Sequence, residues 1–132
     1  MELEDKILEA LNFYVNDPSK RCTNGFFCKY SGKSLGIDTP GCIVGYFLPE
    51  ETRKNWDKKQ GFNISCWTCI DEILPPPAFI QENLYLFSKL QIFHDDHNYW
   101  SENSLNKKGK IMLEKIIEEF KFNKTKFEHL WK

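Results

Sequence analysis

The sequence predicts an α+β fold, in which a small β-hairpin or sheet packs against four to five α-helices. Several segments carry apolar residues at three- and four-residue steps, the spacing of helices with one buried face. Two short apolar segments, 25–30 and 41–48, lack this spacing, and residues 31–41 between them contain three glycines and a proline. Such a stretch is typical of a loop that joins two strands. A short buried helix over residues 41–48 stays open as an alternative, because short apolar runs cannot be assigned by period alone.

The ends of the helical segments can be placed from local signals. Acidic residues fill the first turn of the first segment, and Pro18 follows its end. Pro49 suits the first turn of the second segment, and Ser104 is a candidate cap for the last. A run of three prolines at 75–77 forms a rigid extended connector. The large apolar residues near the end of the chain are expected to pack back onto the helices. The predicted helices cover residues 3–15, 49–56, 63–74, 79–98 and 104–122.

Size and composition predict one domain that spans residues 1–132. The chain has 18 basic and 19 acidic residues, so it lacks the positive charge that drives nonspecific binding to nucleic acids. No apolar run reaches the ~20 residues that span a bilayer, and the acidic first five residues are unlike a signal peptide. We therefore expect a cytoplasmic protein without a membrane partner, whose five cysteines are reduced thiols.

The end of the helix predicted over residues 79–98 carries the main candidate site. On a helical wheel, four polar residues continue an apolar stripe, whereas His97 lies on the neighbouring stripe. The four are Gln91, His94, Asp95 and Asn98. A buried helix face that becomes polar often borders a pocket, and an amide, an imidazole and a carboxylate could together bind a polar ligand or assist a reaction. The alternative is a polar helix end whose side chains bind backbone carbonyls or a loop.

Two residue pairs have spacings found in zinc sites, but neither predicts a metal. His94 and His97 lie on different stripes of their helix. Cys66 and Cys69 fall on the apolar face of the helix predicted over residues 63–74. Reduced cysteine is commonly buried as a small hydrophobic residue, so packing in the core is the favoured interpretation. A zinc site and a redox pair stay open as alternatives. We expect no metal and no cofactor.

Several short motifs follow one another along the chain and carry a resemblance. They are Arg21-Cys22, Cys28-Lys29-Tyr30, Gly41-Cys42-Ile43-Val44-Gly45 with Leu48-Pro49-Glu50, Leu90-Gln91-Ile92-Phe93-His94-Asp95, and Trp100. On these motifs the chain resembles a family of small uncharacterised proteins of phages, prophages and bacteria, over roughly residues 20–122. The resemblance implies a shared fold and a phage or mobile-element context in the cytoplasm of a bacterial host cell. It implies no particular reaction.

The function expected from these observations is that of a noncatalytic phage- or prophage-type accessory protein, which binds a small nucleotide-like ligand or a host protein. By analogy with small phage proteins that sequester nucleotide signals, counter-defence is one expected role and a homo-oligomer one expected assembly. The expected ligand-binding residues are Arg21, Tyr30, Cys42, Gln91, His94, Asp95 and Asn98.

Two alternatives from other functional classes stay open. A thiol-dependent hydrolase or transferase would use Cys42 as the nucleophile and His94 as the base, which requires the thiol to lie within hydrogen-bond reach of the imidazole. A protein–protein interaction module would instead present its aromatic residues as an exposed apolar patch.

Overall fold

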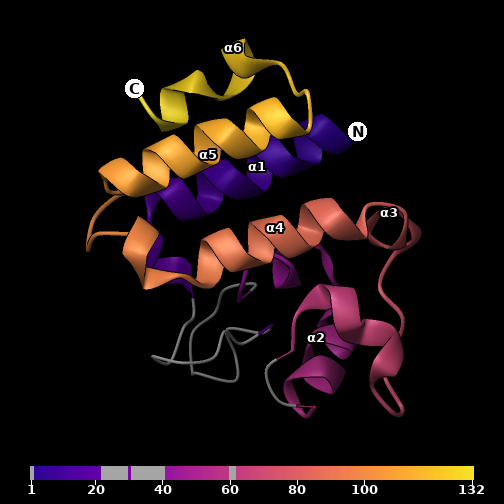
Figure 1. Cartoon of the computed structure of the whole chain (residues 1–132). Helices are drawn as coiled ribbons and strands as arrows, with labels where there is room; N and C mark the ends of the chain where they lie inside the picture. The colour runs from indigo at the N-terminus through magenta and orange to yellow at the C-terminus, as the bar shows by residue number, and fades with distance from the viewer. Residues whose placement is uncertain (1, 22–29, 31–40, 60–61) are drawn as a thin grey trace. The chain divides into compact units, whose positions relative to one another are not determined.

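The computed structural model describes residues 2–21, 30, 41–59 and 62–132 and shows helices joined by turns (Figure 1). The chain divides into two compact units, each described by itself below. The terminal unit comprises residues 1–19 and 96–132, and the central unit comprises residues 20–95. The α-helices are α1 (Leu3–Asn16), α2 (Glu50–Asp57), α3 (Ala78–Gln81), α4 (Leu84–Asp95), α5 (Lys107–Glu119) and α6 (Lys124–Phe127). The 3₁₀-helices are η1 (Pro18–Arg21), η3 (Gly45–Phe47), η4 (Ile64–Cys69), η5 (His97–Tyr99) and η6 (Glu128–Leu130).

In the terminal unit, α1 and α5 contribute most of the buried apolar side chains. These are Ile7, Ala10, Leu11 and Tyr14 from α1, and Leu113, Ile116 and Ile117 from α5. The chain after α5 is tied to α1 by polar contacts. Glu4 accepts a hydrogen bond from the backbone N–H of Asn123, and Lys126 Nζ lies 3.3 Å from Asp5 Oδ1. Phe127 is fully buried, which confirms the prediction that apolar residues near the end of the chain pack back.

The core of the central unit is built around Trp56, a fully buried residue of α2. Its indole Nε1 donates a 2.8 Å hydrogen bond to the carbonyl of Leu74, so the polar atom of the ring is satisfied. The rings of Tyr30 and Phe62 lie 5.1 and 5.2 Å from the Trp56 ring. Helix α4 packs against η4 and α3, and Gln91 of α4 is hydrogen-bonded to Tyr30. The helix that carries the candidate site is therefore joined to the aromatic core.

The predicted β-hairpin, and with it the α+β fold, is wrong. Residues 41–48 form turns and η3, and the described parts of the chain contain an isolated bridge between Trp100 and Leu105 but no sheet. The N–H of Tyr46 bonds to the carbonyl of Cys42 at 2.9 Å, which is a helical rather than an extended connection. Residues 42–45 are all buried, so the run lacks the alternation of a half-exposed strand. The other expected strand, 25–30, lies outside the described residues except for its last residue.

The longest predicted helix, over residues 79–98, is interrupted. It consists of α3 and α4 and stops at Asp95, so Asn98 belongs to η5 instead. Asn83 lies at the break, where its Nδ2 donates a 2.7 Å hydrogen bond to the carbonyl of Phe79. Such side-chain bonds to nearby backbone compete with the regular helical pattern. The wheel that placed Asn98 with the other polar residues therefore continued a helix past its end.

The remaining predicted helices are present, with changes at their ends. The first two are confirmed as α1 and α2. The last is α5, and its cap is Asn106 rather than Ser104, because Asn106 Oδ1 accepts a 2.8 Å hydrogen bond from the N–H of Gly109. No helix in the described part of the chain is long and apolar enough to cross a membrane.

The segment predicted as a helix over residues 63–74 contains η4 alone. Cys66 and Cys69 are exposed, so the prediction that they pack in the core is wrong. A 3₁₀-helix has three residues per turn, so side chains three apart lie in line. Ile64 and Trp67 share one line, and they are the buried and the half-buried residues of η4. The two cysteines share another line, which faces solvent.

Candidate functional site

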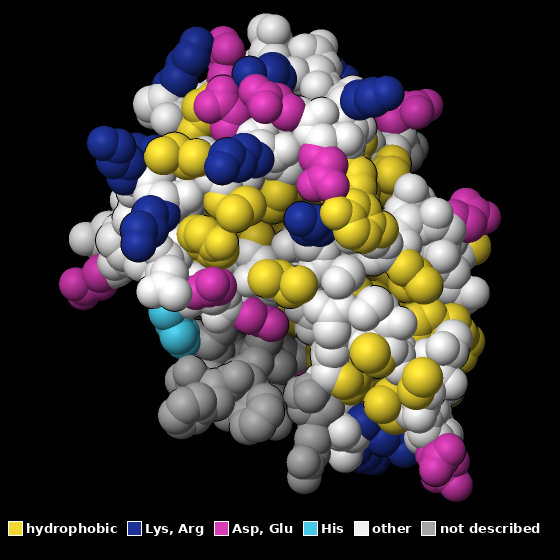
Figure 2. Space-filling view, in the orientation of Figure 1, with side chains coloured by type: hydrophobic (Ala, Val, Ile, Leu, Met, Phe, Trp, Pro, Cys, Tyr) yellow, Lys and Arg dark blue, Asp and Glu magenta, His cyan; other side chains and the backbone are white. Residues whose placement is uncertain are grey.

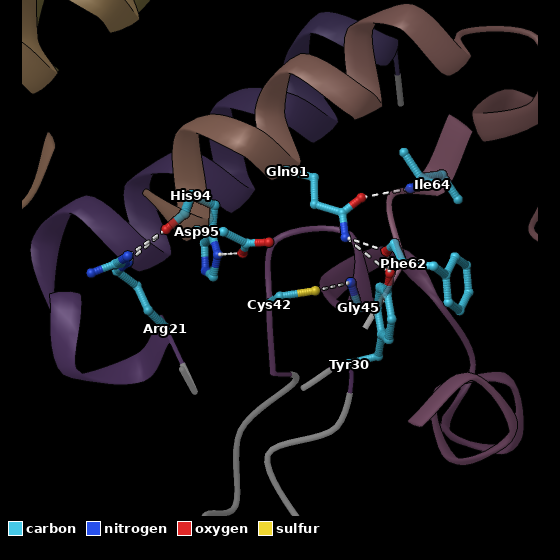
Figure 3. Close-up of polar contacts among 9 residues, drawn as sticks. All are labelled: Arg21, Tyr30, Cys42, Gly45, Phe62, Ile64, Gln91, His94 and Asp95. Carbon is cyan, nitrogen blue, oxygen red and sulfur yellow. Dashed lines mark hydrogen bonds and ion pairs between the residues drawn. The ribbon is translucent and has the colours of Figure 1, made fainter. Parts of the chain in front are cut away.

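Gln91 uses both ends of its amide within the central unit. The side chain is 4% exposed. Its Oε1 accepts a 2.7 Å hydrogen bond from the backbone N–H of Ile64, and its Nε2 donates to the Tyr30 hydroxyl at 2.9 Å and to the Phe62 carbonyl at 3.1 Å (Figure 3). Tyr30 in turn donates to the Phe62 carbonyl at 2.7 Å. The predicted pair of Gln91 and Tyr30 is therefore brought together, in a network that joins α4 to the aromatic core.

His94 is fully buried one turn further along α4. Its Nδ1 lies 3.0 Å from Asp95 Oδ1, and its backbone carbonyl accepts hydrogen bonds from Arg21 Nε at 2.9 Å and Nη2 at 2.5 Å (Figure 3). Burial lowers the pKa of His94 below its usual 6.5, and this outweighs the carboxylate of Asp95, which raises it; the positive charge of Arg21 lowers it further. The imidazole is therefore neutral at pH 7, and Nδ1 carries the proton that the carboxylate accepts.

The lowered pKa of His94 predicts loss of stability in mild acid. Unfolded His94 takes up a proton near pH 6.5 and folded His94 does not. The unfolded state therefore binds more protons, and the free energy of unfolding should fall by up to about 1.4 kcal/mol for each pH unit below that value. Urea unfolding measured as a function of pH tests this. His94→Gln should flatten the dependence, whereas His97→Gln at an exposed position should leave it unchanged. If the free energy of unfolding of His94→Gln depends on pH as strongly as that of the wild type, the lowered pKa of His94 is not the cause of the acid destabilisation.

Cys42 lies in the same region but directs its sulfur towards η3. The residue is fully buried, and its Sγ accepts a 3.4 Å hydrogen bond from the N–H of Gly45. In Figure 3 the sulfur points towards Gly45 and away from His94. Gly41, just before it, has a φ of 92°, which glycine adopts without strain. This geometry favours a structural thiol over a nucleophile activated by His94.

Asn98 belongs to the other unit. It is exposed in η5, where its N–H donates to Asp96 Oδ1 at 2.9 Å and its carbonyl accepts from Asn106 Nδ2 at 2.7 Å. The predicted site is thus divided, because the other members all lie in the central unit. These members are Arg21, Tyr30, Cys42, Gln91, His94 and Asp95.

A groove on the terminal unit was not predicted from the sequence. It has a volume of about 210 Å³ and is called the α5 groove here. Its lining residues are Lys107, Lys110, Ile111, Glu114 and Trp131. Figure 2 shows lysine side chains interspersed with apolar side chains over α5. In the sequence these lysines resemble ordinary solvated surface, and Trp131 is too distant along the chain for a local pattern to connect it with them.

The α5 groove has two lysines and one glutamate in its lining. The N-terminus of a helix already has a partial positive charge, which acidic residues normally offset. The first turn of α5 has no acidic residue and begins with Lys107 and Lys108. The one carboxylate of the groove, Glu114, is paired with Lys124 Nζ at 3.1 Å. The hydrogen bonds that Lys124 donates to Glu118 and then to Glu114 raise the pKa of Lys124, so this pairing persists at neutral pH. The groove therefore favours an anion.

The two regions offer different chemistry. The side-chain atoms Oε1 and Nε2 of Gln91 and Nδ1 of His94 bond to other atoms of the central unit, while two lysines and an indole ring line the α5 groove. Within the described residues, no group of three or more His, Cys, Asp or Glu side chains could hold a metal ion. The resemblance to phage and prophage proteins stays a prediction. No protein-family model, curated protein or solved structure matches the chain.

Proposed function

We propose that the protein is a noncatalytic binding protein for a small nucleotide-like ligand, and that the ligand binds in the α5 groove. One observation carries the proposal: two lysines at the N-terminus of a helix and an indole ring line the same groove. Helix N-termini bind phosphate groups through their backbone N–H groups and their dipole. Nucleotide bases stack on aromatic faces whatever their sequence identity. The groove therefore combines a site for a phosphate with a site for a base.

Each lining residue has a distinct role in this proposal. Lys107 and Lys110 lie one turn apart and would pair with the phosphate. Trp131 is half-buried, so that part of its indole is accessible for stacking. Ile111 is 48% exposed and supplies an apolar surface beside the ring. The volume lies below the ~300 Å³ at which typical ligand pockets begin, which favours a mononucleotide that leaves part of itself in solvent.

The polar network of the central unit has a supporting role in this proposal. Hydrogen bonds hold α4 in place at two positions, since Gln91 bonds to Ile64 and Phe62 and the carbonyl of His94 accepts from Arg21. Their contribution is to stability rather than to ligand contact. Ligand binding and unfolding therefore respond to different substitutions.

Calorimetric titration of the whole protein with adenosine monophosphate tests the proposal, with inorganic phosphate as a second probe. Replacing both Lys107 and Lys110 by Ala should weaken binding of both probes, because both carry phosphate. Trp131→Leu should weaken the binding of adenosine monophosphate by about tenfold, since stacking contributes roughly 1–3 kcal/mol per base. The affinity for inorganic phosphate should be nearly unchanged.

The matched control is Lys115→Ala, on α5 but outside the groove lining. It removes a similar charge from the same helix and should alter binding little. The proposal fails if neither probe binds, or if Lys115→Ala weakens binding as much as the groove variants do. Circular dichroism of each variant confirms that it is folded.

A further inference from the structure

Cys66 and Cys69, the third and the last residue of η4, form an exposed pair. Both are free thiols with exposed side chains. They are three residues apart in a 3₁₀-helix, where one turn takes three residues and rises about 6 Å. Their side chains therefore project in the same direction from adjacent turns. Disulfides join Cα atoms that lie roughly 4.4–6.8 Å apart and Cβ atoms roughly 3.5–4.5 Å apart. The Cα spacing of one 3₁₀ turn fits this range, and the last turn of η4 has to tighten for the two Cβ atoms to reach theirs.

The segment that carries the pair is anchored at its beginning. Asn63 Oδ1 accepts hydrogen bonds from the N–H of Ser65 at 2.9 Å and from the hydroxyl of Ser88 at 2.8 Å. Ile64 is buried, and its N–H donates to Gln91 at 2.7 Å. The N–H of Cys66 bonds to the Asn63 carbonyl at 2.9 Å. These contacts fix the first turn of η4 on α4, so the two thiols are presented to solvent from a defined backbone.

We propose that Cys66 and Cys69 form a reversible dithiol–disulfide pair that exchanges with small-molecule disulfides such as oxidised glutathione. One cysteine thiolate attacks a glutathione sulfur, breaks the glutathione S–S bond and releases one glutathione thiolate. The second cysteine thiolate then attacks the protein sulfur of the mixed disulfide and releases the second glutathione. Two protein thiols are oxidised, one small disulfide is reduced to two thiols, and the two thiol protons pass to the released glutathione.

This inference is independent of the proposed function. The pair belongs to η4 of the central unit, whereas the α5 groove belongs to the terminal unit. Loss of nucleotide binding would leave the redox proposal standing, and an inert thiol pair would leave the groove proposal standing.

To test the proposal, the whole protein is equilibrated in mixtures of reduced and oxidised glutathione. Its free thiols are then blocked with N-ethylmaleimide, and the protein is digested with trypsin. Cleavage after Lys and Arg places Cys66 and Cys69 in the peptide 60–89, without another cysteine. Mass spectrometry of this peptide should show either two blocked thiols or a species two hydrogens lighter than the reduced peptide. The amount of the disulfide peptide should increase with the fraction of oxidised glutathione. Excess reduced glutathione should convert it back to the peptide with two blockable thiols.

Three variants separate a pair from two independent thiols. Cys66→Ser and Cys69→Ser should each leave one cysteine that accumulates as a mixed disulfide with glutathione. Cys42→Ser changes a buried thiol and should leave the transition of peptide 60–89 unchanged. The proposal is overturned if the wild-type peptide keeps two blockable thiols at every ratio, if it accumulates glutathione at both positions, or if the thiols are protected only when zinc is added.

Discussion

Replacing Gln91 with Leu should lower the free energy of unfolding by about 3 kcal/mol. Leu has a similar volume but no polar atom, so the buried N–H of Ile64 loses its 2.7 Å acceptor. A buried donor without an acceptor costs about 1–3 kcal/mol, because it gave up its hydrogen bonds to water on folding. The hydrogen bonds from Gln91 Nε2 to Tyr30 and Phe62 are lost as well. Urea unfolding followed by circular dichroism measures the change.

Two further variants show where this effect originates. Tyr30→Phe removes the hydroxyl that Gln91 contacts but leaves the Ile64 bond intact. It should cost about 2 kcal/mol, because the hydroxyl also donates to the Phe62 carbonyl and each of the two hydrogen bonds contributes about 1 kcal/mol. Gln81→Leu makes the same substitution at an exposed position, where it removes one hydrogen bond from Nε2 to the Pro76 carbonyl, and it should cost no more than about 1 kcal/mol. If Gln91→Leu costs no more than Gln81→Leu, the amide does not hold α4 to the core.

Replacing Gly109 with Ala should also destabilise the protein by about 3 kcal/mol, although Ala is the better helix former. Gly109 lies in the first turn of α5 and is buried. A Cβ atom added there would lie 2.1 Å from the carbonyl oxygen of Tyr99 and 2.9 Å from Leu105 Cδ2. The oxygen belongs to the backbone, so a side-chain rotation cannot relieve the contact. The gain in helix propensity, about 1 kcal/mol, is smaller than the cost of moving α5 away from η5.

Lys108→Ala is the matched control for this prediction. It places the same residue type at the preceding, exposed position of α5. It should leave the free energy of unfolding within about 0.5 kcal/mol of the wild-type value. Thermal unfolding of both variants distinguishes the clash from a general effect of changes in this turn. Equal stability of Gly109→Ala and Lys108→Ala would show that η5 and α5 adapt without cost.

The long helices could be predicted from the sequence because their periodic patterns span several turns. Residues 41–48 could not, since an apolar run buried on every side contains no period that separates a strand from a tight helical turn. The prediction that Cys66 and Cys69 pack in the core was wrong for a related reason. At 3.6 residues per turn Cys66 and Cys69 fall on the apolar face, whereas at three per turn they lie in line on the exposed side. Short helices of this kind have no sequence signal that fixes their pitch.

The environment of two predicted residues followed from the sequence. The wheel correctly placed Gln91 and His94 on a buried face. It could not show that the amide of Gln91 is satisfied by Tyr30, 61 residues earlier in the chain. The α5 groove depends on the position of Trp131 beside Lys107 and Lys110, which precede it by 24 and 21 residues in the sequence. Contacts of this range follow from tertiary packing, which local patterns do not contain.

The division of the chain into two units has a consequence for synthesis on the ribosome. The central unit is one continuous stretch, so all of its residues have been made by the time residue 95 is added. The terminal unit joins residues 1–19 to residues 96–132, and contacts such as Lys126 with Asp5 and His129 with Asn12 connect positions 121 and 117 residues apart. Helix α1 is therefore made before residues 96–132, which complete its unit. Its apolar face, which ends up buried, is the surface that a nascent-chain chaperone would encounter.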